Sequence, residues 1–154
     1  MNHVEIIIGS QMGGTEYVAE HVSNLLKDHA IDSQLHEQPD LNDINKDAVW
    51  LVCTSTHGAG DYPDNLVAFI DQVATQVSLE SVQFAVIGIG DSSYDTFNFA
   101  AKNLVNLLVS KGAKQLLPHL EIDVLDSELP EDTAEAWLPK LVHCLEKNEI
   151  GLTQ

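Results

Sequence analysis

Basic residues and long apolar runs are scarce in this sequence. The chain has 7 Lys+Arg against 24 Asp+Glu, a formal net charge of −17. Nucleic acids and anionic membrane surfaces attract basic proteins, so we expect neither as a partner. No apolar run approaches the roughly 18 residues of a membrane span, and no basic-then-apolar leader precedes the first predicted strand. The sequence therefore predicts a cytoplasmic protein whose acidic surface suits a basic face of another protein.

Cysteine is nearly absent, and no pattern in the sequence is typical of a metal or disulfide site. Cys53 and Cys144 are the two cysteines, and their distant positions match no paired metal or redox spacing. We interpret both as small buried hydrophobic side chains. The histidines other than His57 show no ligand spacing, so we predict no metal site.

Length and patterning predict one α/β domain. The chain has 154 residues, 44% of them hydrophobic, and nothing in its composition divides it, so we expect a single domain over 1–154 with a frayed tail at 147–154. Apolar strand-like runs alternate with segments of helical period. The predicted strands are 4–8, 33–36, 48–53, 84–89 and 115–124. The predicted helices are 15–28, 63 to about 74, 97 to about 111, and 133–146, the last interrupted by Pro139. This alternation predicts a parallel sheet covered by helices on both faces.

The first predicted strand leads into a glycine-rich turn and then a helix. The turn reads Gly9-Ser10-Gln11-Met12-Gly13-Gly14, and Thr15 opens the helical segment. The first N–H groups of a helix have no partner within it, and the aligned peptide dipoles leave partial positive charge there. Ser10 and Thr15 add hydroxyl donors, but the loop has no lysine or arginine. We therefore predict that the loop binds a phosphate group through N–H and hydroxyl donors.

The segments after the strands 48–53 and 84–89 are also unusual. Residues 54–65 combine small hydroxyl residues, glycines and the planar side chain of His57, and residues 88–98 combine glycines with Tyr94, an aromatic residue without an obvious core role. The carboxyl ends of parallel strands meet at one edge of a sheet, so we expect both loops to converge with the phosphate loop. Together they predict a site for a flat aromatic ligand that carries a phosphate.

These loops resemble those of the flavodoxin family, in particular its MioC-type short-chain members, and of the FMN domains of diflavin reductases. Residues 10–15 (SQMGGT) resemble the flavodoxin phosphate loop, and residues 55–61 (STHGAGD) and 88–98 (GIGDSSYDTFN) match the second and third flavin loops of the diflavin FMN domains. The resemblance spans nearly the whole chain. It implies a flavodoxin-like α/β fold, with a five-stranded parallel sheet in the order 2-1-3-4-5, and non-covalently bound FMN.

The resemblance also implies which residues contact FMN. Tyr94 is expected to stack on the outer face of the flavin ring and His57 to approach the other face or edge, while the Gly58 peptide reorients on reduction. Met12 stands where many members place a hydroxyl and His57 where diflavin domains often place an aromatic residue, so we expect modest FMN affinity. The implied cofactor-binding residues are Ser10, Gln11, Met12, Gly13, Gly14, Thr15, Ser55, Thr56, His57, Gly58, Ala59, Gly60, Gly90, Asp91, Tyr94, Phe97 and Asn98.

The resemblance implies an electron carrier without catalytic residues of its own, because the redox chemistry belongs to the cofactor. We expect a monomer that shuttles single electrons between a flavodoxin reductase and an electron-accepting enzyme, both docking through basic faces. One alternative is a flavin-dependent NAD(P)H or quinone reductase on the same fold, although the short chain leaves no second domain for a nicotinamide. Another is an interaction module that keeps the fold and binds FMN weakly.

Other nucleotide and phosphate sites fit the residues less well. A nucleotide-hydrolase P-loop needs a lysine that residues 9–15 lack, and the glycines there miss the Gly-x-Gly-x-x-Gly spacing of dinucleotide-binding folds. A response-regulator receiver needs a phospho-accepting aspartate at the end of the third strand. Cys53-Thr54 stands at that position, so we set this class aside.

Overall fold

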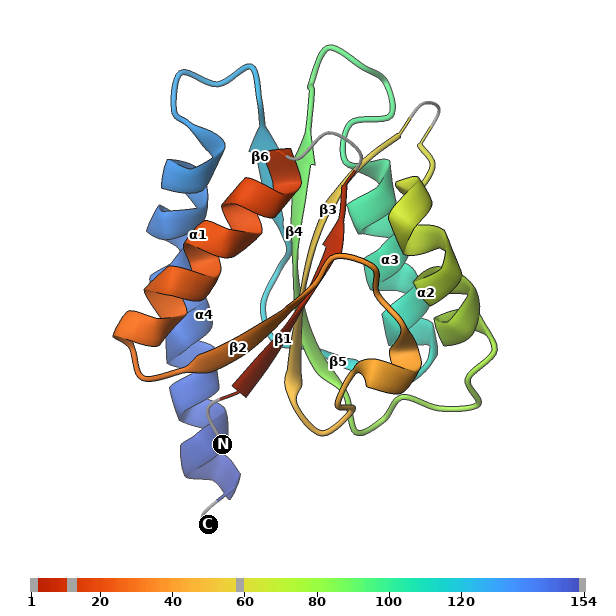
Figure 1. Cartoon of the computed structure of the whole chain (residues 1–154), viewed down its shortest axis with the longest axis vertical. Helices are drawn as coiled ribbons and strands as arrows, with labels where there is room; N and C mark the ends of the chain where they lie inside the picture. Colours follow the sequence, from red (N-terminus) through yellow and green to blue (C-terminus); the bar gives the residue numbers. More distant parts are fainter. Residues whose placement is uncertain (1–2, 11–13, 58–59, 153–154) are drawn as a thin grey trace.

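A parallel sheet lies between two pairs of helices in the computed structural model (Figure 1). The structure describes residues 3–10, 14–57 and 60–152. The strands are β1 (His3–Gly9), β2 (Asp32–His36), β3 (Val49–Ser55), β4 (Gln83–Gly90), β5 (Lys114–Gln115) and β6 (Leu120–Asp123), and they form one sheet in the order β2-β1-β3-β4-β5, with β6 also paired to β4. All these pairings are parallel. The predicted flavodoxin-like fold and strand order are confirmed.

The predicted fifth strand is divided into two pieces. β5 pairs with the start of β4 at Gln83 and Phe84, whereas β6 pairs with its end from Ile87 to Gly90. Pro118 lies between the two pieces, and a proline has no N–H group to donate to a neighbouring strand. The break leaves the carboxyl end of β6 beside that of β4, so the segment after β6 reaches the same edge of the sheet as the loops after β1, β3 and β4.

Helices α1 (Gly14–Asp28), α2 (Asp64–Ala74) and α3 (Phe99–Ser110) agree with the prediction to within about two residues, but α4 (Pro130–Leu152) does not. It begins before the predicted Thr133 and continues through most of the predicted tail. Pro130 suits the first helical position, and Glu131 and Asp132 interact favourably with the positive end of the helix dipole. Pro139 lies inside α4, where the buried Trp137 and Leu138 before it hold the helix against the sheet.

Two hydrophobic cores flank the sheet. Side chains alternate along β1, so Ile6 and Ile8 face α1 and α4 while Ile7 faces α2 and α3. On the second face the Trp50 and Phe69 rings pack with centroids 5.7 Å apart. Cys53 is buried in the first core, and burial raises the pKa of its thiol to about 12. Cys144 is only partly buried, so the prediction of two buried cysteines is confirmed for Cys53 alone.

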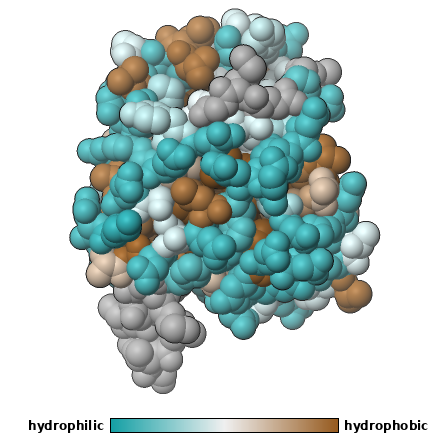
Figure 2. Space-filling view, viewed as in Figure 1, coloured by the Kyte–Doolittle hydropathy of each residue, from teal (hydrophilic) through white to brown (hydrophobic). Residues whose placement is uncertain are grey.

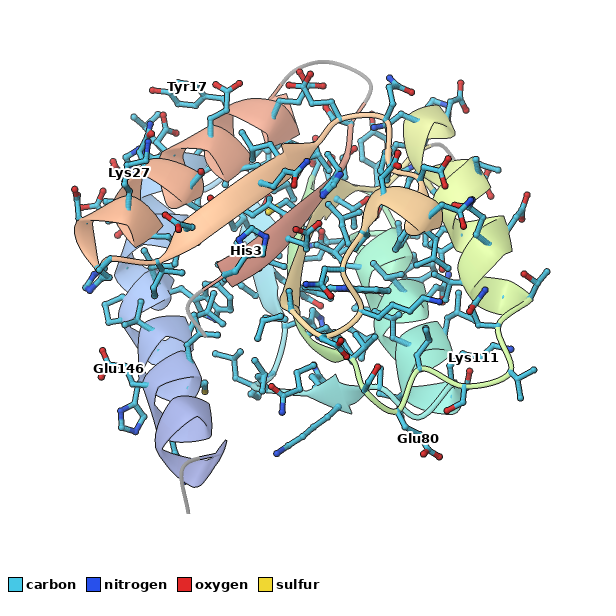
Figure 3. The ribbon with its side chains drawn as sticks, turned by 60° about the horizontal axis from the view of Figure 1, so that its bottom comes forward. His3, Tyr17, Lys27, Glu80, Lys111 and Glu146 are labelled. Carbon is cyan, nitrogen blue, oxygen red and sulfur yellow. The ribbon has the colours of Figure 1, made fainter. Side chains whose placement is uncertain are left out.

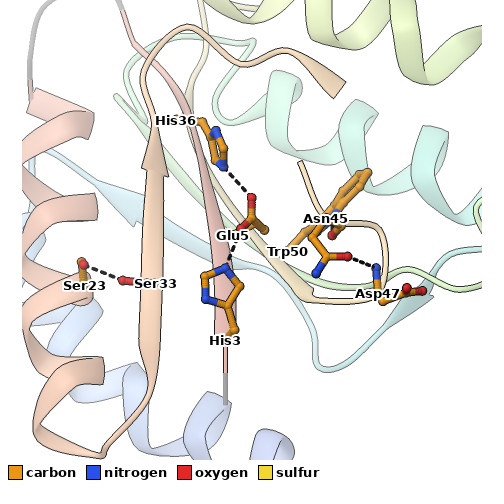
Figure 4. A network of polar contacts seen from close by, with 8 residues as sticks. All are labelled: His3, Glu5, Ser23, Ser33, His36, Asn45, Asp47 and Trp50. Carbon is orange, nitrogen blue, oxygen red and sulfur yellow. Dashed lines mark hydrogen bonds and ion pairs between the residues drawn. The ribbon is translucent and has the colours of Figure 1, made fainter. Parts of the chain in front are cut away.

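A carboxylate lies within the sheet at the β1–β2 edge. Glu5 is 2% exposed and accepts hydrogen bonds from His3 and His36, each over 2.6 Å (Figure 4). A buried charge needs such partners, because an unpaired one loses its hydration without compensation.

A backbone hydrogen bond joins two loops at the end of the molecule where β4 begins. Leu79 N–H donates to Lys111 O over 2.7 Å, and Figure 3 labels Lys111 and Glu80, the residue after Leu79. Within the described residues, no helix is long and apolar enough to cross a membrane.

Candidate functional site

A pocket of about 480 Å³ lies at the carboxyl ends of β1, β3 and β4, which is within the usual size range of small-molecule sites. It brings the three glycine-rich loops together, as predicted. The predicted site residues that line it are Ser10, Gly14, Thr15, Ser55, Thr56, His57, Gly90, Asp91, Tyr94, Phe97 and Asn98. Residues Gln11, Met12, Gly13, Gly58 and Ala59 lie outside the described part of the chain, so their predicted roles stay predictions.

Four described lining residues are not among the predicted contacts, although two of them lie in the predicted loop 88–98. Ile89, Thr96, Val124 and Pro130 line the pocket as well. Val124 follows β6 and Pro130 opens α4, so a fourth segment joins the three predicted loops. A usable signal was present, because the segment after a fifth parallel strand must leave the sheet at the same edge as the other loops.

The corner formed by β1 and α1 suits an anion. Ser10 and Thr15 are both buried, at 8% and 3% exposed, and both line the pocket beside the first residue of α1, Gly14. The N-terminal N–H groups of this 15-residue helix and its dipole favour negative charge. No lysine or arginine is among the described lining residues. A phosphate here would therefore be held by N–H and hydroxyl donors.

The loop after β3 closes on itself before α2 begins. His57 N–H donates to Asp61 O and Asp61 N–H donates to His57 O, both over 2.8 Å. Gly60 has a φ of +103° within this turn, and a Cβ there would lie 3.1 Å from the Phe99 ring. Gly60 is thus a predicted site residue that does not line the pocket. In the structure, Gly60 belongs to the turn between His57 and Asp61, and this turn leaves the exposed His57 side chain at the pocket wall.

Asn98, just before α3, lines the pocket and carries a buried amide. Asn98 precedes the helix in the left-handed region, with a φ of 56°, and its side chain is 0% exposed. Neither Oδ1 nor Nδ2 has a hydrogen-bond partner among the described residues. The amide packs tightly against β4, since Cβ atoms built at Gly88 and Gly90 would lie 2.8 and 3.0 Å from Oδ1. Leaving such a group unpartnered costs about 1–3 kcal/mol, and Asn98 belongs to the pocket wall.

The rim of the pocket is acidic and partly apolar. Tyr94 is 66% exposed, and Val124, Leu125 and Leu129 are about half exposed or more. Figure 2 shows hydrophobic atoms at the top of the molecule, where the 124–129 segment lies. Asp123 joins the two rim loops by accepting hydrogen bonds from Ser92 N–H and Leu125 N–H, over 3.1 and 3.0 Å. These contacts, the one with Ser92 first, lower the pKa of the Asp123 carboxyl.

Polar residues of the described lining make hydrogen bonds within the loops around the pocket. Its carboxylate, Asp91, accepts hydrogen bonds from Ser93 N–H and Ser93 Oγ, over 2.8 and 2.6 Å. Thr56 Oγ1 accepts a hydrogen bond from Ala100 N–H over 3.1 Å and so ties the loop after β3 to α3. The arrangement offers a phosphate corner, a buried amide and an exposed aromatic ring around one cavity, which suits a flat polar ligand with a phosphate tail.

Comparisons with known proteins agree with this geometry. The family model described as flavodoxin matches residues 6–137. The chain is 44% identical to a MioC homolog from Haemophilus influenzae over 93% of this chain and 99% of the relative. It is 34% identical to the NADPH-dependent diflavin oxidoreductase 1 of Bos taurus, over 88% of this chain and 24% of that longer protein. A solved mutant of flavodoxin from Pseudomonas aeruginosa superposes with a TM-score of 0.85 at 32% identity, covering 94% of this chain and 99% of that one.

Proposed function

This chain belongs to the flavodoxin family, and we propose that it holds FMN in the pocket at the carboxyl ends of the strands and passes single electrons from a reductase to an acceptor enzyme. Family membership implies FMN as the cofactor. The observation that carries the proposal is Asn98, a pocket-lining residue whose buried side-chain amide has no partner among the described residues.

The residues present fit FMN. Ser10, Thr15 and the first N–H groups of α1 would hold the phosphate without a basic side chain. The Asn98 amide, with one acceptor and two donor hydrogens, would hydrogen-bond to polar atoms of the flavin. The Tyr94 ring would cover the outer ring face, since stacked aromatic groups gain about 0.5–1.5 kcal/mol beyond burial. His57, on the loop after β3, would lie against the other face or edge.

The residues of this chain position the cofactor and leave one edge open to a partner. FMN supplies the one-electron chemistry when bound. Tight packing around Asn98 fixes the wall formed by α3, and the exposed Tyr94 marks the side from which electrons enter and leave. Each cycle takes one electron from the reductase and gives one to the acceptor, so no bond to a substrate forms or breaks.

The partners of this carrier would dock through basic faces. The chain has a formal net charge of −17, and acidic side chains such as Asp91, Asp95 and Asp126 belong to the loops around the pocket mouth. Opposite charge steers two proteins together and raises the association rate at low salt. In this role the protein would act as a cytoplasmic monomer that meets each partner in turn.

Anaerobic photoreduction of the FMN-loaded protein tests the proposal. We expect two separate one-electron steps in the absorbance record, and electron transfer from the reduced protein to cytochrome c, a basic haem protein used here as the acceptor. We expect no sustained turnover with NADH or NADPH alone. A single two-electron step with steady oxidation of NADPH would contradict the carrier proposal and favour a reductase on the same fold.

A further inference from the structure

A second asparagine lies behind the phosphate corner and does not line the pocket. Asn65 is the second residue of α2, and its side chain reaches backbone groups near the ends of β1 and β2. Its Oδ1 accepts a hydrogen bond from Ser10 N–H over 2.9 Å. Its Nδ2 donates to Ile8 O and to Glu37 O, each over 2.8 Å. The amide therefore joins three backbone groups from the ends of β1 and β2.

These three groups lie where the β1–β2 pairing ends. The last paired residues are Ile7 and His36, so Glu37 O and Ser10 N–H lie beyond the ladder. A side-chain amide carries the same donor and acceptor groups as a peptide. The Asn65 amide thus takes the place of a further peptide between the strands and satisfies groups that would otherwise have no partner in the sheet.

The contact with Asn65 fixes the direction of the Ser10 N–H group at the end of β1. Ser10 N–H is directed at Asn65 Oδ1, while the buried Ser10 residue lines the pocket. Asn65 thereby holds the backbone at Ser10, directly after β1. It also couples the loop after β1 to the start of α2, directly after the turn that carries His57.

We infer that Asn65 is a positioning residue for the FMN phosphate: it holds the exit of β1 so that Ser10, Thr15 and the start of α1 enclose the phosphate, without touching FMN itself. This inference rests on the proposed function, because it assigns the phosphate of FMN to that corner. It predicts that losing the Asn65 amide weakens the phosphate contacts much more than the contacts to the flavin ring.

The experiment compares FMN with riboflavin, which has the same ring and no phosphate. Dissociation constants for both flavins are measured by fluorescence quenching with wild type, Asn65→Ala and Asn65→Ser. Asn103→Ala is the control, since Asn103 is an exposed asparagine of α3. For Asn65→Ala we expect FMN affinity to fall at least about tenfold and riboflavin affinity to change less than about threefold. Asn65→Ser, which keeps one donor and one acceptor, should lie between Asn65→Ala and wild type.

The outcomes separate this inference from the proposed function. An equal loss of affinity for both flavins would mean that Asn65 only supports the fold and would overturn the inference, as would unchanged FMN affinity in Asn65→Ala. If wild type binds neither flavin, the proposed function itself is wrong. Circular dichroism of each variant checks its folding, and if Asn65→Ala does not fold, the same comparison is made with Asn65→Ser, where a loss limited to FMN supports the inference and an equal or absent loss overturns it.

Discussion

Helices α2 and α3 begin in similar places, each soon after a loop at the carboxyl end of a strand, yet the asparagines at their starts are in opposite states. Asn65 makes three hydrogen bonds to backbone groups of other segments. Asn98 is 0% exposed, and its side-chain amide makes no hydrogen bond among the described residues. A partnered amide contributes to the scaffold, whereas an unpartnered buried amide costs stability until a ligand reaches it.

The contrast separates two kinds of polar residue in one site. Around Asn65 the protein satisfies its own backbone groups without a ligand. At Asn98 the amide donor and acceptor have no partner among the described residues, and the residue lines the cavity. The difference predicts opposite responses to mutation, which the following experiments measure in order of expected effect.

Asn65→Ala should give the largest loss of stability in the protein without FMN. Three hydrogen bonds are lost, each worth about 1 kcal/mol, so the free energy of unfolding should fall by about 3 kcal/mol. Urea unfolding followed by circular dichroism measures the change, with Asn103→Ala as the control that should stay near wild type. A loss under about 1 kcal/mol would mean that Asn65 is not part of the scaffold.

Gly88→Ala should cost about 1–3 kcal/mol of unfolding free energy, because an added methyl group overpacks the contact between β4 and α3. Its Cβ would lie 2.7 Å from Ala101 Cβ and 2.8 Å from Asn98 Oδ1. Gly14→Ala is the matched control, since a Cβ at this first residue of α1 meets no described atom within 4 Å, and its unfolding free energy should stay within about 1 kcal/mol of wild type. Equal thermal stability for the two variants would contradict the packing described around Asn98.

Asn98→Gly should change the unfolding free energy of the FMN-free protein by only about 1 kcal/mol or less. Glycine adopts the φ of 56° without strain and removes the unpartnered amide. FMN affinity should nevertheless fall about tenfold, as measured by fluorescence titration. If FMN affinity stayed at the wild-type value, the proposal that the Asn98 amide hydrogen-bonds to FMN would be wrong.

The pH dependence of the rim should be the smallest effect. The pKa of Asp123 is lowered by its contacts with Ser92 and Leu125, so the carboxylate stabilises the folded state above the unfolded pKa of 3.8. This contribution is lost as the pH falls below 3.8 through the folded value. The stability difference between wild type and Asp123→Ala should therefore be constant from pH 7 to about pH 5 and shrink at lower pH. If the stability difference between wild type and Asp123→Ala grew as the pH fell, it would contradict the lowered pKa of Asp123.

The sequence was sufficient for the fold where local pattern and tertiary packing agree. The runs 48–53 and 84–89 predicted β3 and β4, because strands buried on both faces are continuously apolar. The division of the fifth strand and the early start of α4 coincide with two prolines, Pro118 and Pro130, which are local signals in the sequence. Eleven of the seventeen site residues that the family resemblance implied line one pocket.

The roles of individual polar residues were beyond the sequence. Asn65 contacts groups 28 to 57 positions away, and no local pattern predicts which side chain completes a distant sheet edge. Asn98 was predicted as a cofactor contact through the family resemblance, but its lack of a partner depends on how α3 packs on β4. Gly60 was placed in the site, whereas its described position closes the turn before α2.

Titration of the FMN-free protein with FMN tests the central claim most directly. Flavin fluorescence and absorbance are followed as FMN is added to wild type and to Asn98→Gly. The account predicts saturable binding of one FMN per chain, with quenched fluorescence, and weaker binding by the variant. No saturable binding by a folded wild-type protein would contradict the assignment of this pocket to FMN.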